Sequence, residues 1–135
     1  MNRDDLVAAA VAMVGTPFHA QGRMPGVGLD CVGVVVCAAR QCGYVPNDRS
    51  AYPMRPDGTL RPAIEAALVR VDGAPEPGDV ILMAFAGLEP HHVAIYVGND
   101  QIVHAYVHAR KVAKQQYTQY WKSKVVAVYR FPEAA

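Results

Sequence analysis

The spacing of apolar residues predicts three helices in the first half of the chain. Residues 4–14 carry apolar side chains every three or four positions, and a glycine followed by a Thr-Pro pair ends that pattern. Residues 29–42 form a strongly apolar segment, and residues 59–69 form a shorter one with a proline in its first turn. A proline-rich stretch, residues 44–58, separates the last two, and we interpret it as an ordered loop on the substrate side.

The second half of the chain predicts an antiparallel sheet. Its apolar positions alternate or form short runs, and turn residues separate them. The predicted strands cover residues 79–85, 91–97, 101–107, 110–114 and 124–131, with a short helix or turn at residues 117–121. The first strand is apolar at nearly every position, so we place it in the centre of the sheet. Helices followed by antiparallel strands indicate an α+β fold, with the helices packed on one side of the sheet.

Composition and charge narrow the class of protein. The chain has 135 residues, so we expect one domain over residues 1–135. A net charge of +1 with scattered Lys and Arg argues against nucleic acid as the main partner. We expect no membrane span, because no apolar run is long enough. No signal peptide is visible, so we expect the chain to be cytoplasmic as synthesised.

Cys31 is the candidate nucleophile. It follows Asp30, a good N-cap residue, so it is expected in the first turn of the helix. Unpaired N–H groups and the helix dipole there would lower the pKa of a thiol. The alternative is that Cys31 is a small buried apolar residue, as most free cysteines are. Cys37 and Cys42 form no metal or redox spacing with it, and we interpret them as core or partly buried thiols.

Two histidines fall on one face of a predicted hairpin. A three-residue turn at residues 98–100 would pair Val97 with Gln101. His92 and His104 then become diagonal neighbours on one face, whereas a two-residue turn would place them on opposite faces. In that arrangement His92 can take the thiol proton, and His104 can fix the tautomer and orientation of His92.

A metal site is a weaker interpretation of the same region. Cys31, His91 and His92 offer zinc-binding groups, but their spacing matches no zinc motif. His91 also alternates onto the strand face opposite to that of His92. We therefore expect neither a metal nor a cofactor.

Five short motifs stand in order along the chain. They are Gly15-Thr16-Pro17-Phe18, Leu29-Asp30-Cys31-Val32-Gly33, Pro77-Gly78-Asp79-Val80, His92-Val93-Ala94-Ile95-Tyr96-Val97-Gly98 and Ile102-Val103-His104-Ala105. With them the chain resembles the NlpC-type cysteine peptidases, papain-like bacterial cell-wall hydrolases, in register from Leu6 to Tyr129. The resemblance implies a papain-like fold with Cys31 as nucleophile, His92 as general base and His104 as third catalytic residue. It also implies cleavage of peptide bonds in peptidoglycan stem peptides.

The loop before the cysteine departs from the family pattern. Relatives usually carry an aromatic hydroxyl there, whereas this chain has Phe18 followed by His19. An oxyanion hole needs a donor besides the backbone N–H of Cys31, and the amide of Gln21 is our candidate. Phe18 and His19 are further substrate-side candidates. The residue after the cysteine is commonly Ser in the family and is Val32 here. The sequence of this loop most resembles that of short family members encoded with phage tail genes.

Three functional hypotheses follow for the chain. The first is a peptidase that cleaves peptidoglycan stem peptides and is delivered to the cell wall with phage tail proteins, as part of a virion or tail-like particle. The second is a structural tail-tip or assembly subunit with the same fold and little turnover. The third is an acyl-transfer enzyme that acts on a lipid or an amide. An intact set of Cys31, His92 and His104 favours an enzyme over the second, and the lack of a lipid-facing segment disfavours the third.

Overall fold

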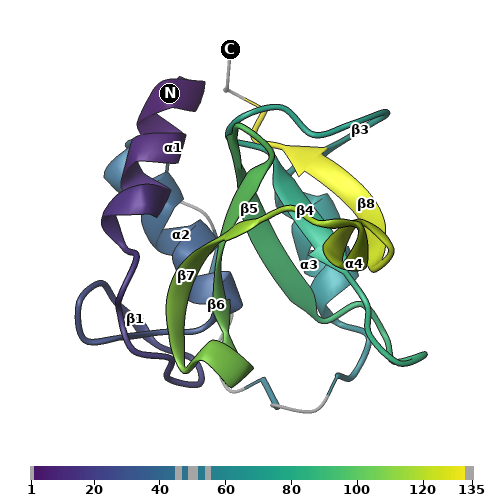
Figure 1. The fold of residues 1–135 in the computed structure, drawn as a ribbon, viewed down its shortest axis with the longest axis horizontal. Helices are drawn as coiled ribbons and strands as arrows, with labels where there is room; N and C mark the ends of the chain where they lie inside the picture. Colours follow the sequence, from purple (N-terminus) through teal and green to yellow (C-terminus); the bar gives the residue numbers. More distant parts are fainter. Residues whose placement is uncertain (1, 45–46, 49–51, 54–55, 133–135) are drawn as a thin grey trace.

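Two helices lie side by side against one face of a six-stranded antiparallel sheet (Figure 1). The computed structural model describes residues 2–44, 47–48, 52–53 and 56–132. The sheet has the strand order β3-β8-β4-β5-β6-β7, with bounds β3 Val69–Val71, β4 Val80–Met83, β5 His92–Gly98, β6 Gln101–Tyr106, β7 Lys111–Gln116 and β8 Val125–Arg130. The helices are α1 Arg3–Ala12, α2 Cys31–Gln41, α3 Leu60–Ala67 and α4 Gln119–Lys122. This is the α+β fold that the sequence predicts.

The core has a layer on each face of the sheet. Helices α1, α2 and α3 cover one face, where side chains such as Met13 and Ile64 meet the inward residues of the strands. The short helix α4 lies on the opposite face, where Trp121 packs with Ile81 and Ile102. The expectation that the helices pack on one side of the sheet therefore holds for α1 to α3, and α4 is the exception. Strand β4 is buried at each of its four positions and lies centrally, as expected.

The start of helix α2 is fixed by a side-chain cap and by a close backbone contact. Asp30 accepts a hydrogen bond from the backbone N–H of Gly33 at 2.8 Å, which confirms it as the N-cap. A Cβ atom at Gly33 would lie 2.2 Å from the carbonyl oxygen of Gly22, so only glycine fits against that loop. The helix ends at Gln41, and Gly43 follows with a φ of 83°.

The hairpin between β5 and β6 keeps the predicted faces but not the predicted turn. Gly98 pairs with Gln101, so the turn has two residues, Asn99 and Asp100, both with positive φ. Strand pairing resumes at Tyr96 opposite Ile102, and Val97 is an extra residue between these two pairs. This bulge offsets the shorter turn, and His92 and His104 therefore still share a face.

Several short elements lie where the sequence predicted loops. A two-stranded ribbon of β1 (Arg23–Met24) and β2 (Gly28–Leu29) lies in the predicted loop and takes in Leu29, the first residue of the predicted helix. Val107–Ala109 form a 3₁₀ turn beyond β6. Strand β3 was also missed. The predicted loop of residues 44–58 lies partly outside the described residues. Of the described part of the chain, no helix is both long and apolar enough to cross a membrane.

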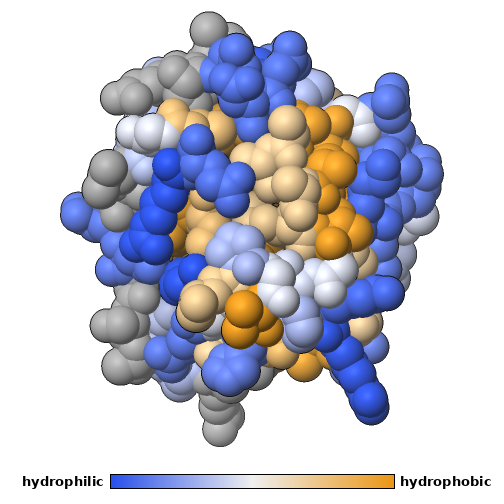
Figure 2. All heavy atoms as spheres, turned by 90° about the vertical axis from the view of Figure 1, so that its left-hand side faces the viewer, coloured by the Kyte–Doolittle hydropathy of each residue, from blue (hydrophilic) through white to orange (hydrophobic). Residues whose placement is uncertain are grey.

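Apolar side chains also reach the surface beside α1. Figure 2 shows this face with an apolar area at its centre and hydrophilic residues around it. Val11 in α1 is 38% exposed, and Val14 just beyond it is 43% exposed. Much of any folded protein's accessible surface is apolar, so exposed valines need no special explanation.

Candidate active site

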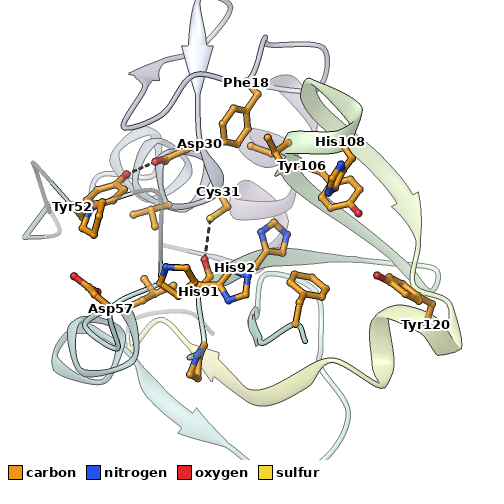
Figure 3. Close-up of a pocket in the computed structure, with 18 residues that line it drawn as sticks. Phe18, Asp30, Cys31, Tyr52, Asp57, His91, His92, Tyr106, His108 and Tyr120 are labelled. Carbon is orange, nitrogen blue, oxygen red and sulfur yellow. Dashed lines mark hydrogen bonds between the residues drawn. The ribbon is translucent and has the colours of Figure 1, made fainter. Parts of the chain in front are cut away.

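Cys31 opens helix α2 at the floor of a cleft of about 370 Å³ (Figure 3). The sulfur lies 3.9 Å from the carbonyl oxygen of His91. Tyr52 and Asp57 lie on one side of the cleft, and Tyr106, His108 and Tyr120 lie on the other. The cleft is lined by Phe18, Asp30, Cys31, Val32, Tyr52, Pro53, Pro56, Asp57, Leu60, Phe85, Pro90, His91, His92, Ala105, Tyr106, Val107, His108 and Tyr120. Four described residues of the predicted 44–58 loop, Tyr52, Pro53, Pro56 and Asp57, thus border the cleft.

The two predicted histidines are joined directly. Nε2 of His92 lies 2.7 Å from Nδ1 of His104, and Nε2 of His104 lies 2.6 Å from Oε1 of Gln115. His92, at the start of β5, lines the cleft beside Cys31, whereas His104 lies behind it and is fully buried. The structure therefore brings together Cys31, His92 and His104, and it adds Gln115 on β7, which the sequence did not single out.

Aromatic rings hold the histidine pair in place. Tyr106 stacks on His104 with an interplanar angle of 1° and a centroid distance of 5.4 Å. Trp121 meets His104 edge-on at 4.9 Å, and Phe85 lies 5.8 Å from His92. These contacts restrict the planes of both imidazoles, so their nitrogens keep fixed directions.

The pKa of Cys31 moves in the direction opposite to the prediction. Burial of the thiol and the charge of Asp30 raise its pKa to about 11, although the backbone N–H groups of Val93, Val32 and Cys31 itself lower it. The prediction counted the helix N-terminus but not desolvation or the neighbouring carboxylate. The resting thiol is therefore protonated near neutral pH.

Both histidines are neutral near neutral pH. Burial lowers the pKa of His92 well below its ordinary value, and the neighbouring His104 and His91 lower it further. Burial also lowers the pKa of His104, while its hydrogen bond to Gln115 opposes that shift. The resting site therefore pairs a neutral thiol with a neutral imidazole, which has a free lone pair for a proton.

A charged network supports the carboxylate of Asp30. Its Oδ1 accepts a hydrogen bond from Nη1 of Arg23 at 3.0 Å, and its Oδ2 accepts from the hydroxyl of Tyr52. Arg23 also forms two contacts with Asp48, at 2.8 and 3.1 Å. Tyr52 therefore brings an aromatic hydroxyl to the cleft from a different loop, whereas Phe18 offers none. The sequence offered no signal for Tyr52 beyond its place in the predicted substrate-side loop.

The three loop candidates have different positions. Phe18 lines the cleft. Gln21 has a φ of 59°, and its amide nitrogen donates to the carbonyl oxygen of Tyr52 at 2.7 Å. His19 is exposed, and its Nδ1 lies 2.9 Å from the carbonyl oxygen of Ala20. Neither Gln21 nor His19 lines the cleft, so the predicted oxyanion role of the Gln21 amide is not supported by its position.

Metal-binding groups do not gather at the site. Within the described ranges, no three His, Cys, Asp or Glu side chains are grouped so that they could hold an ion. His91 turns its Nδ1 to the carbonyl oxygen of Glu89 at 2.7 Å.

Comparisons with known proteins find similar sequences and a similar fold. The model of the NlpC/P60 family matches residues 15–130. The chain is 27% identical over 131 residues to the probable peptidoglycan endopeptidase LytE of Bacillus subtilis, covering 97% of this chain and 35% of that protein. It is 32% identical over 57 residues to the tail tip assembly protein K of Escherichia phage lambda, covering 42% of this chain and 28% of that protein. The chain thus spans about a third of the length of these curated relatives.

A solved structure supports the same fold. NlpC1 from Trichomonas vaginalis superposes with a TM-score of 0.76 over 96% of this chain and 44% of that one, at 19% sequence identity. Its likeness concerns the arrangement of helices and sheet.

Proposed function

Because the chain belongs to the NlpC/P60 family, we propose that it is a cysteine peptidase that hydrolyses peptide bonds in peptidoglycan stem peptides. The observation that carries this proposal is the joint position of Cys31 and the His92–His104 pair at one cleft. A nucleophile, a base and a group that orients the base are the parts that acyl transfer by a thiol requires. The endopeptidase relative LytE supports peptidoglycan as the substrate class.

In the proposed reaction, Nδ1 of His92 takes the proton from the thiol of Cys31 as the sulfur attacks the substrate carbonyl. The carbonyl π electrons move to oxygen, and the backbone N–H of Cys31, at the helix start, stabilises the resulting oxyanion. The His92 imidazolium then gives its proton to the leaving amine, and the C–N bond breaks to leave a thioester. His92 removes a proton from water, whose oxygen attacks the thioester carbonyl. The C–S bond then breaks, His92 returns the proton to the sulfur, and the acid product leaves.

The resting protonation states fit a general-base step. A protonated Cys31 and a neutral His92 hold no charge in a buried site, so the empty cleft avoids the cost of desolvating an ion pair. Charge forms when substrate occupies the cleft and donors can stabilise it.

Defined peptidoglycan fragments test the proposal. Incubation of the purified protein should yield two products whose masses add up to the fragment plus one water. Cys31→Ala should abolish the products, and Cys42→Ala, which removes a thiol outside the cleft, should leave them unchanged. Intact fragments after incubation with a folded parent protein would contradict the proposal.

A structural role in a phage tail is the second candidate, favoured by the match to the lambda tail tip assembly protein. We propose further that the chain is made in the cytoplasm and reaches the wall with a tail or tail-like particle; the match bears on the tail alone. Tail particles purified from cells that express the chain should then contain it. Loss of infectivity in particles that carry Cys31→Ala would distinguish an enzymatic role from a purely structural one. Unchanged infectivity with normal assembly would favour the structural role.

A further inference from the structure

The hydrogen-bond chain from the cleft does not end at His104. Oε1 of Gln115 lies 2.6 Å from Nε2 of His104. Ala113 of β7 lies opposite His104 of β6, and Gln115 lies opposite Ile102. Because alternate residues share a face, Gln115 is a diagonal neighbour of His104 on the same face. The contact is therefore built into the register of two paired strands.

The atom that Gln115 presents decides which nitrogens carry protons. An amide oxygen only accepts hydrogen bonds, so Nε2 of His104 must carry a hydrogen. A neutral imidazole has one N–H, so Nδ1 of His104 is an acceptor, and Nε2 of His92 must donate to it. Nδ1 of His92 then has no hydrogen and holds the lone pair that can take the thiol proton.

The reverse arrangement of protons would disable the base. If the donor end of the amide faced His104, Nε2 of His104 would accept and its Nδ1 would donate to His92. The hydrogen of His92 would then sit on Nδ1, where no lone pair would remain for the thiol of Cys31. Stacking by Tyr106 and the edge contact of Trp121 oppose a ring flip that could repair the mismatch.

We propose that Gln115 is a positioning residue that sets the tautomers of both histidines and so leaves Nδ1 of His92 as the proton acceptor. The inference rests on the proposed function for its catalytic consequence, but its effect on the tautomers stands without turnover. His104 is fully buried, so solvent cannot readily replace the amide oxygen.

Three variants test this role. Gln115→Met removes the acceptor at similar volume, Gln115→Glu keeps an acceptor there, and Gln116→Met changes a neighbour on the opposite strand face. Nitrogen-15 NMR of the imidazoles should show Nε2–H tautomers for both His92 and His104 in the parent, the Glu variant and the Gln116 control. Gln115→Met should instead show a mixture of tautomers at His104 and His92, with thermal unfolding used to confirm that it folds.

Turnover gives the second measurement. Gln115→Met should lower kcat roughly 10- to 100-fold with little change in KM, as for other residues that orient a functional imidazole. Gln115→Glu should retain most of the kcat that Gln115→Met loses. A folded Gln115→Met protein with parental tautomers and kcat would overturn the inference, as would an Nδ1–H tautomer at His92 in the parent. If the parent itself does not hydrolyse the fragments, the proposed function fails, while the NMR result still decides the role of Gln115.

Discussion

Asp30 stabilises the helix that carries Cys31 and at the same time disfavours the thiolate of Cys31. Its Oδ1 caps α2 through Gly33, whereas its charge is the second largest cause, after burial, that raises the pKa of the thiol. Arg23 and Tyr52 bind the same carboxylate and hold it in place. The same side chain therefore stabilises the helix and makes ionisation of the nucleophile less favourable.

Alkylation of Cys31 should depend steeply on pH in the free protein. Because the thiolate reacts and the pKa is raised to about 11, we expect the rate to rise from about pH 6 to about pH 10 without a plateau. Peptide mapping after iodoacetamide treatment distinguishes Cys31 from Cys37 and Cys42. A rate independent of pH between about pH 6 and 8 would instead indicate a resting thiolate–imidazolium pair.

Replacing Asp30 by Asn should make Cys31 more reactive and the protein less stable. The charge that opposes the thiolate is lost, so alkylation at a fixed alkaline pH should become several-fold faster. Loss of the charged hydrogen bond to Arg23 should lower the free energy of unfolding by about 1–3 kcal/mol. Asp48→Asn also removes an ion pair of Arg23 but should leave alkylation of Cys31 unchanged. Equal alkylation rates in Asp30→Asn and the parent would refute the electrostatic explanation.

Stability should fall as the pH drops below about 6.5, the ordinary value for histidine. Since burial lowers the folded-state pKa values of His92 and His104, the unfolded chain binds protons that the folded protein does not. Below about pH 6.5 each group lowers the free energy of unfolding by at most about 1.4 kcal/mol per pH unit, and above that pH the stability no longer depends on these two groups' protonation. Denaturant unfolding below about pH 6.5 should show a shallower slope for His92→Gln and for His104→Gln than for the parent. Parallel curves for all three proteins would contradict the shifts.

Removal of each histidine should have unequal effects on turnover. His92→Ala removes the base and should abolish measurable hydrolysis. His104→Ala leaves the base but not its orientation, so a residual rate should remain. The kcat of each variant on the same fragment is the measurement, and equal residual rates would mean that the two roles are misassigned.

Gln21→Ala should change kcat little. Its amide donates to the carbonyl of Tyr52, and Gln21 is not among the residues that line the cleft, so we expect a loss of no more than about threefold, well below the loss expected for an oxyanion donor. A hundredfold loss in Gln21→Ala would restore the original hypothesis that its amide stabilises the oxyanion.

Tyr52→Phe removes a hydroxyl that binds Asp30 at the cleft wall and should lower kcat/KM about tenfold.

Local signals predicted the parts of the site that depend on neighbouring residues. Asp30 as N-cap and Cys31 in the first helical turn follow from short-range patterns. The shared face of His92 and His104 was predicted from a three-residue turn, whereas the structure reaches it through a two-residue turn and the bulge at Val97. The roles of these groups in catalysis stay predictions.

Tertiary contacts account for what the sequence did not predict. Tyr52 reaches Asp30 across 22 positions, and no local pattern in its loop marks it. Gln115 depends on the register between β6 and β7. The raised pKa of Cys31 depends on desolvation by the folded chain, which outweighs the helix N-terminus that the sequence makes visible.

The unpaired Val97 sets the register that serves the active site. If Val97 paired with Ile102 and the strands ran regularly from the two-residue turn, His92 and His104 would lie on opposite faces, because side chains alternate at every step. Loss of Val97 would remove the bulge but keep Gly98 opposite Gln101 and Tyr96 opposite Ile102, so the histidines would still share a face. A slip of β6 past β5 by one residue would instead point His104 toward the helices and bring a valine or alanine to its place. Such a slip would inactivate the site while leaving every catalytic residue in the sequence, so the strand register is as much a part of this active site as the identity of its side chains.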